Sequence, residues 1–600
     1  MKLWFYDVEV FPHDWLIVFR TEGKRIVVIN DKDHLERVLI EIGSDLLVGF
    51  NNYGYDDTIL GAIMTGRDPY KISQEIIEER NKKLKWQLRI TSPLTIDARQ
   101  ELPINLSLKE IEANTGQDII ESNIPWDIDR KLTWHELYET IYYCDYDVQQ
   151  VEKLMNQAER ISYFGAKVGL IKEFNLPISY IRLTRARLMS SAMVCDKSIP
   201  LPQDRLDFDY APTLDVDDID PEVYNFYEAI RQRYLGGGNP EELEKLAFTT
   251  FLAGVEHKYG FGGLHGAKLR YIDQGLFVHA DFESYYPSEM IKYNFISRRS
   301  KKPEILERTF VKRVRLKKLK DPEQEPLKVG INAVFGILKD KFNDAFDPKM
   351  SNNICINGQL IISELIKELE PFGELVQTNT DGVIFKIHDK GMVQDIKDAC
   401  TDFGQRYQIN LDNDYINKIA QRDVNNYVMR FDNGKIDAKG VFARWNEDKL
   451  PTNFKSNTLS IVDIALKAYY IDGIEVEDTI LDLYDRNVML PFQIISKMGH
   501  TYDHMVHLVD GEFVRLGQNV NRVFATHEEG KGIVAKVKNR PVTDPETGEI
   551  IHYVPSYNKI PNCPDRTVIH NEDISSFDKK KLDLQWYVDL VNDAKFGYNK

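Results

Sequence analysis

The sequence lacks the cysteine pairs that would indicate a structural metal site or a disulfide framework. Its five cysteines lie far apart in the 600 residues, at Cys144, Cys195, Cys355, Cys400 and Cys563. This distribution predicts free thiols in a reducing cytoplasm and argues against structural zinc. No stretch approaches about 18 uninterrupted apolar residues, so no membrane span is expected. An acid also interrupts the apolar N-terminal run, which is unlike a signal peptide.

A net positive charge is missing as well. The net charge is −17 and the pI is near 5.4, which on its face argues against nucleic acid as the partner. Binding depends, however, on where the positive charge lies. Residues 298–320 hold eleven Lys or Arg against two Glu, although a solvated helix face would also explain such a cluster. The length predicts about four domains, and a hydrophobic content of 42% is ample for packed cores.

A single acid stands where an apolar strand is predicted to end. We expect a strand at Gly275–Val278, and Asp281 follows it. Pro287 suits the first turn of a helix, whose N-terminal amides attract anions. A carboxylate beside such amides could hold a divalent metal against a triphosphate. A strand-to-helix turn with a surface acid explains the same residues, so the segments that follow must decide between a metal site and an ordinary turn.

Acids also gather near the N-terminus. Asp7 and Glu9 alternate on a predicted strand and therefore project from one face. Asp56 follows in a Gly-rich and Asn-rich segment, and Tyr143 and Asp147 share one face of a predicted helix. Two adjacent carboxylates repel each other unless a cation lies between them. The four acids could hold two Mg²⁺ ions about 4 Å apart, an arrangement that cleaves phosphodiesters.

Two later segments carry further polar groups. On a predicted helix, Lys328, Asn332 and Phe335 share one stripe, and Gly336 permits a close approach. Such a stripe suits a triphosphate, a base and a sugar, although an amphipathic surface helix would also show it. Around Asp381, an Asp-Gly pair between two apolar runs predicts a hairpin tip that could face Asp281 across a sheet.

In this order the segments resemble the motifs of family B DNA polymerases. Residues 281–288 resemble motif A, with Tyr285 in place of Leu, and residues 328–336 resemble motif B. Residues 379–382 resemble motif C, except that Asn379 stands where the family usually has its first aspartate. The resemblance runs from residue 7 to residue 440, about three quarters of the chain.

The resemblance implies a set of residues for synthesis. Asp281 and Asp381 would be the catalytic metal ligands, and Phe282 is assigned to the same metal site. Residues implied to bind the dNTP are Arg313, Lys317, Lys328, Asn332 and Tyr286, the last stacking under the sugar. Residues implied to contact primer–template DNA are Lys435, Lys439, Gly440, Gly262 and Gly263. Without its usual carboxylate at Asn379, the site should bind metal slightly less strongly.

The N-terminal acids resemble the three motifs of the DEDDy group of 3′–5′ exonucleases. The resemblance makes Asp7, Glu9, Asp56 and Asp147 metal ligands and Tyr143 the residue that orients the attacking water. Asn51, with Ser107 and Leu108 of a Ser-Leu-x-x-hydrophobic element, would touch single-stranded primer ends; that element is also an ordinary helix start.

The implied fold is multidomain, α/β and α+β, with an RNase H-like 3′–5′ exonuclease domain and a right-hand polymerase of palm, fingers and thumb. The expected domains are the exonuclease at 1–160, a helical connector at 161–255, palm at 256–296, fingers at 297–345, palm at 346–450, and thumb with the C-terminal region at 451–600.

The resemblance implies a DNA-directed DNA polymerase with proofreading, two Mg²⁺ (or Mn²⁺) ions per active site, and primer–template DNA, dNTPs and single-stranded DNA as partners. We expect a monomer, with replisome proteins as further partners and a phage or mobile element as source, acting in the host bacterial cytoplasm.

Three alternatives stay open. One is a protein-primed polymerase, disfavoured because Asp281 and Lys328 are only 47 residues apart. The others are an exonuclease with an impaired polymerase site and a DNA-binding scaffold.

Overall fold

The computed structural model describes residues 2–79, 81, 83–102, 106–443, 459–543 and 550–596. It is a mixed α/β structure that divides into two compact units. Unit 1 contains residues 1–162, 443–469 and 474–595, and unit 2 contains residues 163–442, 470–473 and 596–600. The predicted boundary between residues 450 and 451 lies outside the described residues. Among those described, no helix combines the length and the apolar character needed to cross a bilayer.

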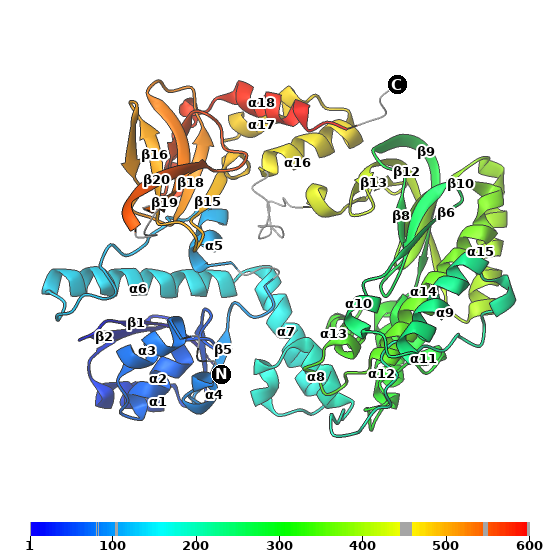
Figure 1. The fold of residues 1–600 in the computed structure, drawn as a ribbon, viewed down its shortest axis with the longest axis horizontal. Coiled ribbons are helices and arrows are strands. Elements are labelled where there is room, and N and C mark those ends of the chain that lie inside the picture. The colour runs from blue at the N-terminus through cyan, green and yellow to red at the C-terminus, as the bar shows by residue number, and fades with distance from the viewer. Residues whose placement is uncertain are drawn as a thin grey trace. The chain divides into compact units, whose positions relative to one another are not determined.

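The N-terminal part of unit 1 is built on a mixed five-stranded sheet with the order β3-β2-β1-β4-β5 (Figure 1). β1 pairs antiparallel with β2 and parallel with β4, so β1 is central and largely buried. Apolar side chains of β1 and of the helices beside the sheet form one core. The elements are β1 (Leu3–Val10), β2 (Trp15–Thr21), β3 (Lys24–Ile29), α1 (Lys32–Ile42), β4 (Leu46–Gly49), α2 (Asp56–Met64), α3 (Pro69–Ile77), α4 (Leu84–Gln87), β5 (Leu94–Asp97), α5 (Leu108–Asn114) and α6 (Trp134–Met155).

The C-terminal part of unit 1 contains two small antiparallel sheets and three helices. One sheet has the order β15-β18-β21 and the other β17-β16-β19-β20. The elements are α16 (Ser460–Lys467), α17 (Val476–Asp485), β15 (Ile494–Lys497), β16 (His504–Val509), β17 (Glu512–Arg515), β18 (Val520–Ala525), β19 (Lys531–Thr543), β20 (Ile550–Lys559), β21 (Thr567–Ile569) and α18 (Leu584–Asp593).

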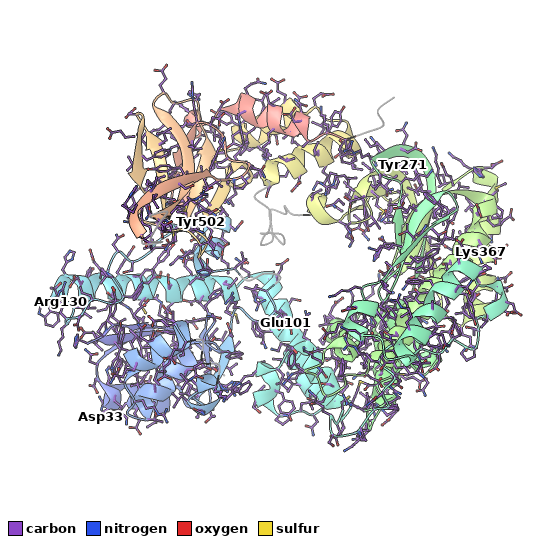
Figure 2. All side chains as sticks on the ribbon, in the orientation of Figure 1. Asp33, Glu101, Arg130, Tyr271, Lys367 and Tyr502 are labelled. Carbon is purple, nitrogen blue, oxygen red and sulfur yellow. The ribbon has the colours of Figure 1, made fainter. Side chains whose placement is uncertain are left out.

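Unit 2 is organised around a nine-stranded sheet with the order β14-β13-β12-β9-β11-β10-β8-β7-β6. Tyr271, at the start of β9, is labelled among the side chains of Figure 2. β9 lies between β11 and β12, which places the end of this strand at the centre of the sheet. The strands are β6 (Phe248–Leu252), β7 (Val255–Tyr259), β8 (His265–Ala267), β9 (Tyr271–Phe282), β10 (Gly373–Asn379), β11 (Gly382–Ile387), β12 (Leu411–Asp423), β13 (Asn426–Phe431) and β14 (Ile436–Ala438).

Helices of unit 2 precede and interrupt this sheet in the sequence. Among the helices between Asp281 and the hairpin, α12 and α13 pack against each other and form a helical pair. The helices are α7 (Ala158–Glu173), α8 (Arg185–Ala192), α9 (Pro221–Leu235), α10 (Pro240–Leu243), α11 (Tyr285–Lys292), α12 (Glu304–Lys318), α13 (Gln324–Lys339), α14 (Pro348–Leu369) and α15 (Val393–Tyr407).

Two candidate metal centres

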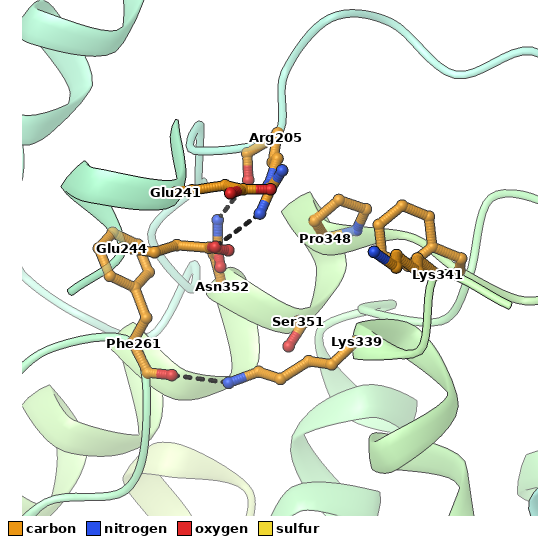
Figure 3. A pocket seen from close by; sticks show the side chains of 10 residues that line it. Arg205, Glu241, Glu244, Phe261, Lys339, Lys341, Pro348, Ser351 and Asn352 are labelled. Carbon is orange, nitrogen blue, oxygen red and sulfur yellow. Dashed lines mark hydrogen bonds and ion pairs between the residues drawn. The ribbon is translucent and has the colours of Figure 1, made fainter. Parts of the chain in front are cut away.

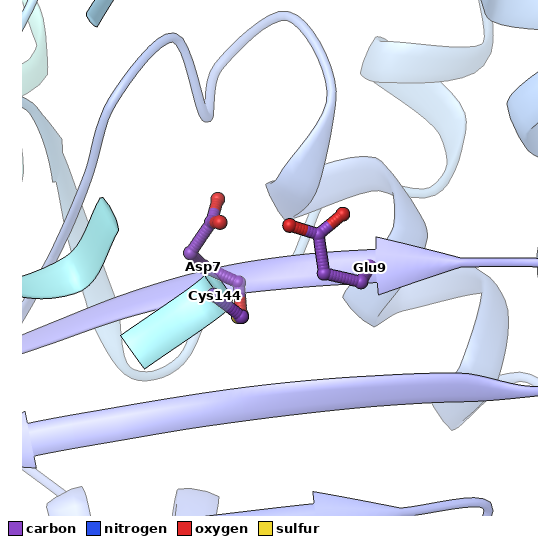
Figure 4. Close-up of side chains that lie close together, drawn as sticks. All are labelled: Asp7, Glu9 and Cys144. Carbon is purple, nitrogen blue, oxygen red and sulfur yellow. The ribbon is translucent and has the colours of Figure 1, made fainter. Parts of the chain in front are cut away.

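The first centre lies on one face of β1. The carboxylates of Asp7 and Glu9 project to the same side of the strand, as their spacing predicted (Figure 4). Ligand atoms of Asp7, Glu9 and Cys144 lie within 4.8 Å of one another. The Cys144 thiol donates to the Asp7 backbone carbonyl at 3.5 Å, so its role is to join α6 to β1. The two carboxylates remain as hard oxygen ligands.

Asp56 adds a third carboxylate from the first turn of α2, and its neighbour Asp57 serves as an internal contrast. Both acids are buried. Asp57 accepts hydrogen bonds from Tyr6 at 2.6 Å, Thr95 at 2.7 Å and Asn52 at 3.0 Å. These donors give Asp57 a structural role. The pKa of Asp56 is instead raised by burial and by Asp7, so Asp56 belongs electrostatically to the acidic group.

Helix α6 supplies Asp147, and Tyr143 one turn before it, at the i, i+4 spacing that was predicted. The Asp147 carboxylate forms an ion pair with Lys109, a residue of α5. Lys109 also pairs with Glu112 at 3.0 Å, and its ammonium lies 4.8 Å from the centre of the Tyr143 ring. Lys109 is a partner that we had not predicted. It lies inside the Ser-Leu-x-x-hydrophobic element, but a lysine on a short helix carries no signal of a distant ion pair.

The four acids raise one another's pKa values. Burial, and then the Asp147 carboxylate, raise the pKa of Asp7 to about 7, although Lys109 opposes this effect. Burial and Asp7 raise the pKa of Glu9, and burial raises that of Asp147. A single lysine does not balance four buried carboxylates. The oxygen donors and the excess negative charge fit divalent Mg²⁺ or Mn²⁺ ions, which would be held by these four residues.

The residues predicted to touch single-stranded DNA lie on two turns of unit 1. Ser107 is the N-cap of α5 in a capping box with Glu110, so the helix-start interpretation of this element is confirmed. Asn51 follows β4 with a positive φ of 61°, and its side-chain oxygen accepts from Arg99 at 2.8 Å. Contacts of Asn51, Ser107 and Leu108 with DNA stay predictions.

The end of α5 is held by a fully buried arginine of the C-terminal part of unit 1. Arg522, on β18, donates to the carbonyls of Ala113 at 3.2 Å and Gln117 at 2.9 Å. Burial lowers its pKa to about 10. Its other acceptors are Gln493, His570 and Glu572. Arg522 therefore donates hydrogen bonds to backbone carbonyls at and just beyond the end of the helix that carries Lys109, where carbonyls lack intrahelical partners.

The second centre lies at the end of β9 in unit 2. β10 and β11 form the predicted hairpin, in which Asn379 pairs with Gly382 around a turn at Thr380 and Asp381. Gly382 in turn lies opposite Asp281 on β9. A methyl group on Gly382 would lie 3.0 Å from Oδ1 of Asp281, so the Asp281 carboxylate lies over the first residue after the tip. The structure brings Asp281 and Asp381 together.

The strand that carries Asp281 is longer than predicted. We expected it to end at Val278, but β9 continues to Phe282. The reason is that both neighbours, β11 and β12, extend beside this segment and pair with Asp281 or Phe282. The Phe282 amide also donates to the Asp381 carbonyl at 2.7 Å. Asp281 is therefore fixed by strand pairing and does not lie in a turn.

Two further acids stand beside Asp281 that we had not predicted. Asp412 lies directly opposite Asp281 on β12, and Asp414 lies opposite His279. Burial raises the pKa of Asp281 to about 7, and Asp381, Asp412 and Asp414 add to the effect. The donor set again fits a divalent cation. No motif marks Asp412 in the sequence, because only the strand register brings it to Asp281 from about 130 residues away.

The basic helix α12 faces this centre. Arg313 is buried and donates to the Ser284 hydroxyl at 2.6 Å, while its Nε has no hydrogen-bond partner among the described residues. Lys317 pairs with Glu283 at 3.2 Å and lies close enough to oppose the rise in the pKa of Asp281. Both cations therefore stand beside the strand end that carries Asp281.

Helix α13 carries the predicted stripe. Lys328 and Asn332 are exposed, and Phe335 is half-buried against Tyr286, with ring centres 4.5 Å apart. An added methyl group on Gly336 would meet no atom within 4 Å. Among the described residues, no atom therefore lies close to the place that a Gly336 side chain would occupy.

The motif A aromatic residues have distinct environments. Tyr285 is buried and donates to the Gly358 carbonyl at 2.8 Å, whereas Tyr286 is partly accessible. Phe282 is buried and stacks on Tyr285 at 4.2 Å. The side chain of Phe282 is therefore part of the core, and only its backbone could serve the predicted metal site.

The glycines predicted to contact DNA also have structural roles. A methyl group on Gly263 would lie 2.2 Å from Oγ1 of Thr380, so only glycine lets this segment pack against the hairpin tip. Gly440 has a φ of 59° and leaves no room for a side chain beside Asn425. Lys435 and Lys439 are exposed beside it. DNA contacts of these residues, and of Gly262, are untested by the structure.

The comparisons with known proteins give one relevant result. No protein-family model matches the chain, and no curated protein matches it. Among solved structures, the chain is similar to the family B DNA polymerase of the hyperthermophilic archaeon Pyrobaculum calidifontis. The match covers 99% of this chain and 77% of that one, with 14% identity and a TM-score of 0.41. At this level the function has to be argued from the residues of the two centres.

Proposed function

We propose that the chain is a family B DNA polymerase that extends primers with dNTPs and removes mispaired 3′ ends by 3′–5′ exonuclease activity. The observation that carries the proposal is the pairing of Asp281 with Gly382, which brings Asp381 of the hairpin tip to Asp281. A cationic helix and the stripe of α13 stand in the same unit, as dNTP binding requires. The acids of β1, α2 and α6 form a separate centre for the exonuclease in unit 1, whose mixed sheet supports an RNase H-like assignment.

Within this proposal, Asp281 and Asp381 would hold two Mg²⁺ ions in unit 2. When bound, the ions lower the pKa of the primer 3′-hydroxyl and neutralise charge on the triphosphate. Arg313 and Lys317, which stand beside the strand end that carries Asp281, and Lys328 on the stripe of α13 would bind the phosphates. The chain's own contribution is mainly positioning and electrostatics.

Two further residues would select the substrate or orient a reactant without reacting themselves. Tyr286, packed on Phe335, would lie under the sugar and exclude a ribose 2′-hydroxyl. In unit 1, Tyr143 would orient the water that attacks the terminal phosphodiester. The five cysteines are free thiols, which supports the cytoplasm as the location. A phage or mobile-element source, a monomeric state and replisome partners are proposed on the sequence resemblance alone.

The decisive experiment is a primer-extension assay with dNTPs and Mg²⁺, run beside degradation of a labelled single strand. Asp381→Ala should abolish extension and leave degradation intact, and Asp7→Ala should do the reverse. The matched control is Asp389→Ala, an exposed acid at the other end of β11. If the unaltered protein degrades single strands but never extends a primer, the chain is an exonuclease with an inactive synthetic site.

A second candidate function, protein-primed synthesis, is distinguished in the same assay by adding a terminal protein. The short helical pair α12–α13 favours nucleic-acid priming, because the segment between Asp281 and Lys328 has little room for an inserted domain. Extension of an ordinary primer without a terminal protein supports this assignment, and a strict requirement for that protein contradicts it. A DNA-binding scaffold would show neither activity.

A further inference from the structure

A cavity of about 580 Å³ lies in unit 2, beyond the C-terminal end of α13 (Figure 3). Its volume is in the range of about 300–1,000 Å³ that is typical of small-molecule sites. Residues of several distant segments line it, among them Phe261 before the two glycines, Lys339 at the end of α13, Lys341 just after it, and Ser351 on α14. None of the motifs described above accounts for this cavity.

The cavity is connected to the synthetic centre along one helix face. Lys328, Asn332, Phe335 and Lys339 follow one another at helical spacing on α13. The Lys339 ammonium lies 5.4 Å from the centre of the Phe335 ring, and it donates to the Phe261 carbonyl at 2.6 Å. Phe335 itself packs on Tyr286. A strand that passes the insertion site along this stripe would therefore reach the cavity next.

The chemistry of the wall suits one unit of a single-stranded nucleic acid. Lys341 lines the cavity and is exposed, and its ammonium lies 5.4 Å from the centre of the Phe342 ring, which exposes 67% of its surface. Two more cations hold this segment through its backbone: Arg187 donates to the Phe342 carbonyl at 3.0 Å and Lys197 to the Lys341 carbonyl at 2.9 Å. Cations interleaved with accessible aromatic rings bind unpaired nucleotides by phosphate contact and base stacking.

Polar groups on the opposite side of the cavity restrict the ligand further. Glu241 and Glu244 lie there beside Arg205, across from Lys341 (Figure 3). Arg205 pairs with Glu244 at 2.7 Å. Two carboxylates would repel a triphosphate, whereas they can accept hydrogen bonds from the amino groups of a base. The ligand class that fits is a base with a single phosphate.

Ser351 provides a second, independent observation. Its side chain is buried, and Oγ has no hydrogen-bond partner with good geometry among the described residues. The nearby Cys355 thiol is a weak partner. A buried hydroxyl without a partner costs free energy unless a ligand or water satisfies it. Ser351 thus contributes to the cavity wall a hydroxyl whose hydrogen-bonding capacity the described residues leave largely unused.

We propose that this cavity binds an unpaired nucleotide of the template strand immediately before that nucleotide enters the insertion site. The proposal rests on the proposed function, because only a template-directed polymerase needs to hold this strand. Lys341 would contact the phosphate, and Phe261 would stack on the base. A free mononucleotide has the same chemistry, so the experiment must separate the two sources.

The experiment measures binding of primer–template hairpins that carry a blunt end or 5′ overhangs of increasing length, by fluorescence anisotropy over a range of salt. The variants are Lys341→Ala and Lys341→Arg. The matched control is Lys390→Ala, an exposed lysine at the other end of the sheet. Loss of one phosphate contact should weaken overhang binding several-fold and reduce the salt slope by about one. Binding of the blunt hairpin should not change, Arg should restore most of the loss, and Lys390→Ala should match the unaltered protein.

The outcomes separate the inference from the function on which it rests. If primers are extended but Lys341→Ala binds every overhang as tightly as the unaltered protein, the cavity does not hold template. If dNMP alone, without DNA, binds in a Lys341-dependent manner and overhang length has no effect, the cavity is a free-nucleotide site and the template assignment is wrong. If the unaltered protein neither binds nor extends any hairpin, the proposed function has failed.

Discussion

The clearest quantitative test concerns Asp7, whose buried carboxylate should destabilise unit 1 in the absence of a divalent ion. Its pKa rises from 3.8 to about 7 in the folded chain. Because the folded pKa lies above the unfolded value, the folded state binds more protons between these two pH values. Stability should therefore fall as the pH rises from about 4 to about 7, and the full penalty should be present above pH 7.

The size of the penalty follows from the two pKa values. Their difference corresponds to about 4 kcal/mol, and we expect about 2 kcal/mol because the Asp7 side chain keeps partial contact with solvent. Asp7→Asn removes the charge and keeps the shape. In EDTA at about pH 8, Asp7→Asn should therefore be more stable than the unaltered protein by about this amount.

The assay is thermal unfolding with and without Mg²⁺, followed across the pH range. Mg²⁺ should raise the melting temperature of the unaltered protein and have much less effect on Asp7→Asn. The control is Asp57→Asn, beside Asp56. Asp57 accepts from Tyr6 and Asn52 through one carboxylate oxygen and from Thr95 through the other, and an Asn amide keeps only one acceptor oxygen, so at least one of these hydrogen bonds is lost. The free energy of unfolding of that variant should fall by about 1–3 kcal/mol at every pH, and Mg²⁺ should still raise its melting temperature. If Asp7→Asn is destabilised in EDTA as Asp57→Asn is, the acids of β1 are not held together by a cation.

Three further predictions concern the other elements. Asn379→Asp should lower the Mg²⁺ concentration needed for half-maximal primer extension several-fold, because it adds a carboxylate beside Asp381; an unchanged or higher requirement would place Asn379 outside the metal site. Gly263→Ala should reduce extension at least tenfold while leaving exonuclease activity intact, since its methyl group would meet Thr380; Gly262→Ala meets no atom, so an equal loss there would mean that the glycines act through DNA. Arg522→Met should cost about 3 kcal/mol or more by leaving buried carbonyls unpaired, and it should reduce exonuclease activity per folded molecule while extension survives; exposed Arg515→Met is the control, and equal loss of both activities would contradict a local role.

The sequence predicted what short local patterns can carry. Alternation placed Asp7 and Glu9 on one face, helical spacing placed Tyr143 beside Asp147, and an Asp-Gly turn placed Asp381 at a hairpin tip. Each of these depends on residues a few positions apart. The predicted end of β9 was wrong, because pairing with β11 and β12 extends the strand beyond its apolar run.

Contacts between distant segments could not be predicted in this way. Asp412 reaches Asp281 only through strand register, and Lys109 reaches Asp147 only when α5 packs against α6. Arg522 bonds mainly to backbone carbonyls, which look alike at every residue. The cavity beyond α13 combines segments separated by up to about 150 residues, from Arg205 to Asn352, and no local pattern in the sequence brings them together. The residue roles in DNA and dNTP binding stay predictions.

The hydrogen bonds from Arg522 to the end of α5 have a consequence for the order in which the chain folds during synthesis. Arg522 follows Ala113 by 409 residues in the sequence, so the partner of the α5 end leaves the ribosome long after α5 itself. At about 5–20 residues per second, this separation corresponds to roughly 20 to 80 seconds of synthesis. During that interval the end of α5 lacks its buried partner. Unit 1, which contains α5 and Arg522, should therefore complete its packing later than residues 163–442 of unit 2.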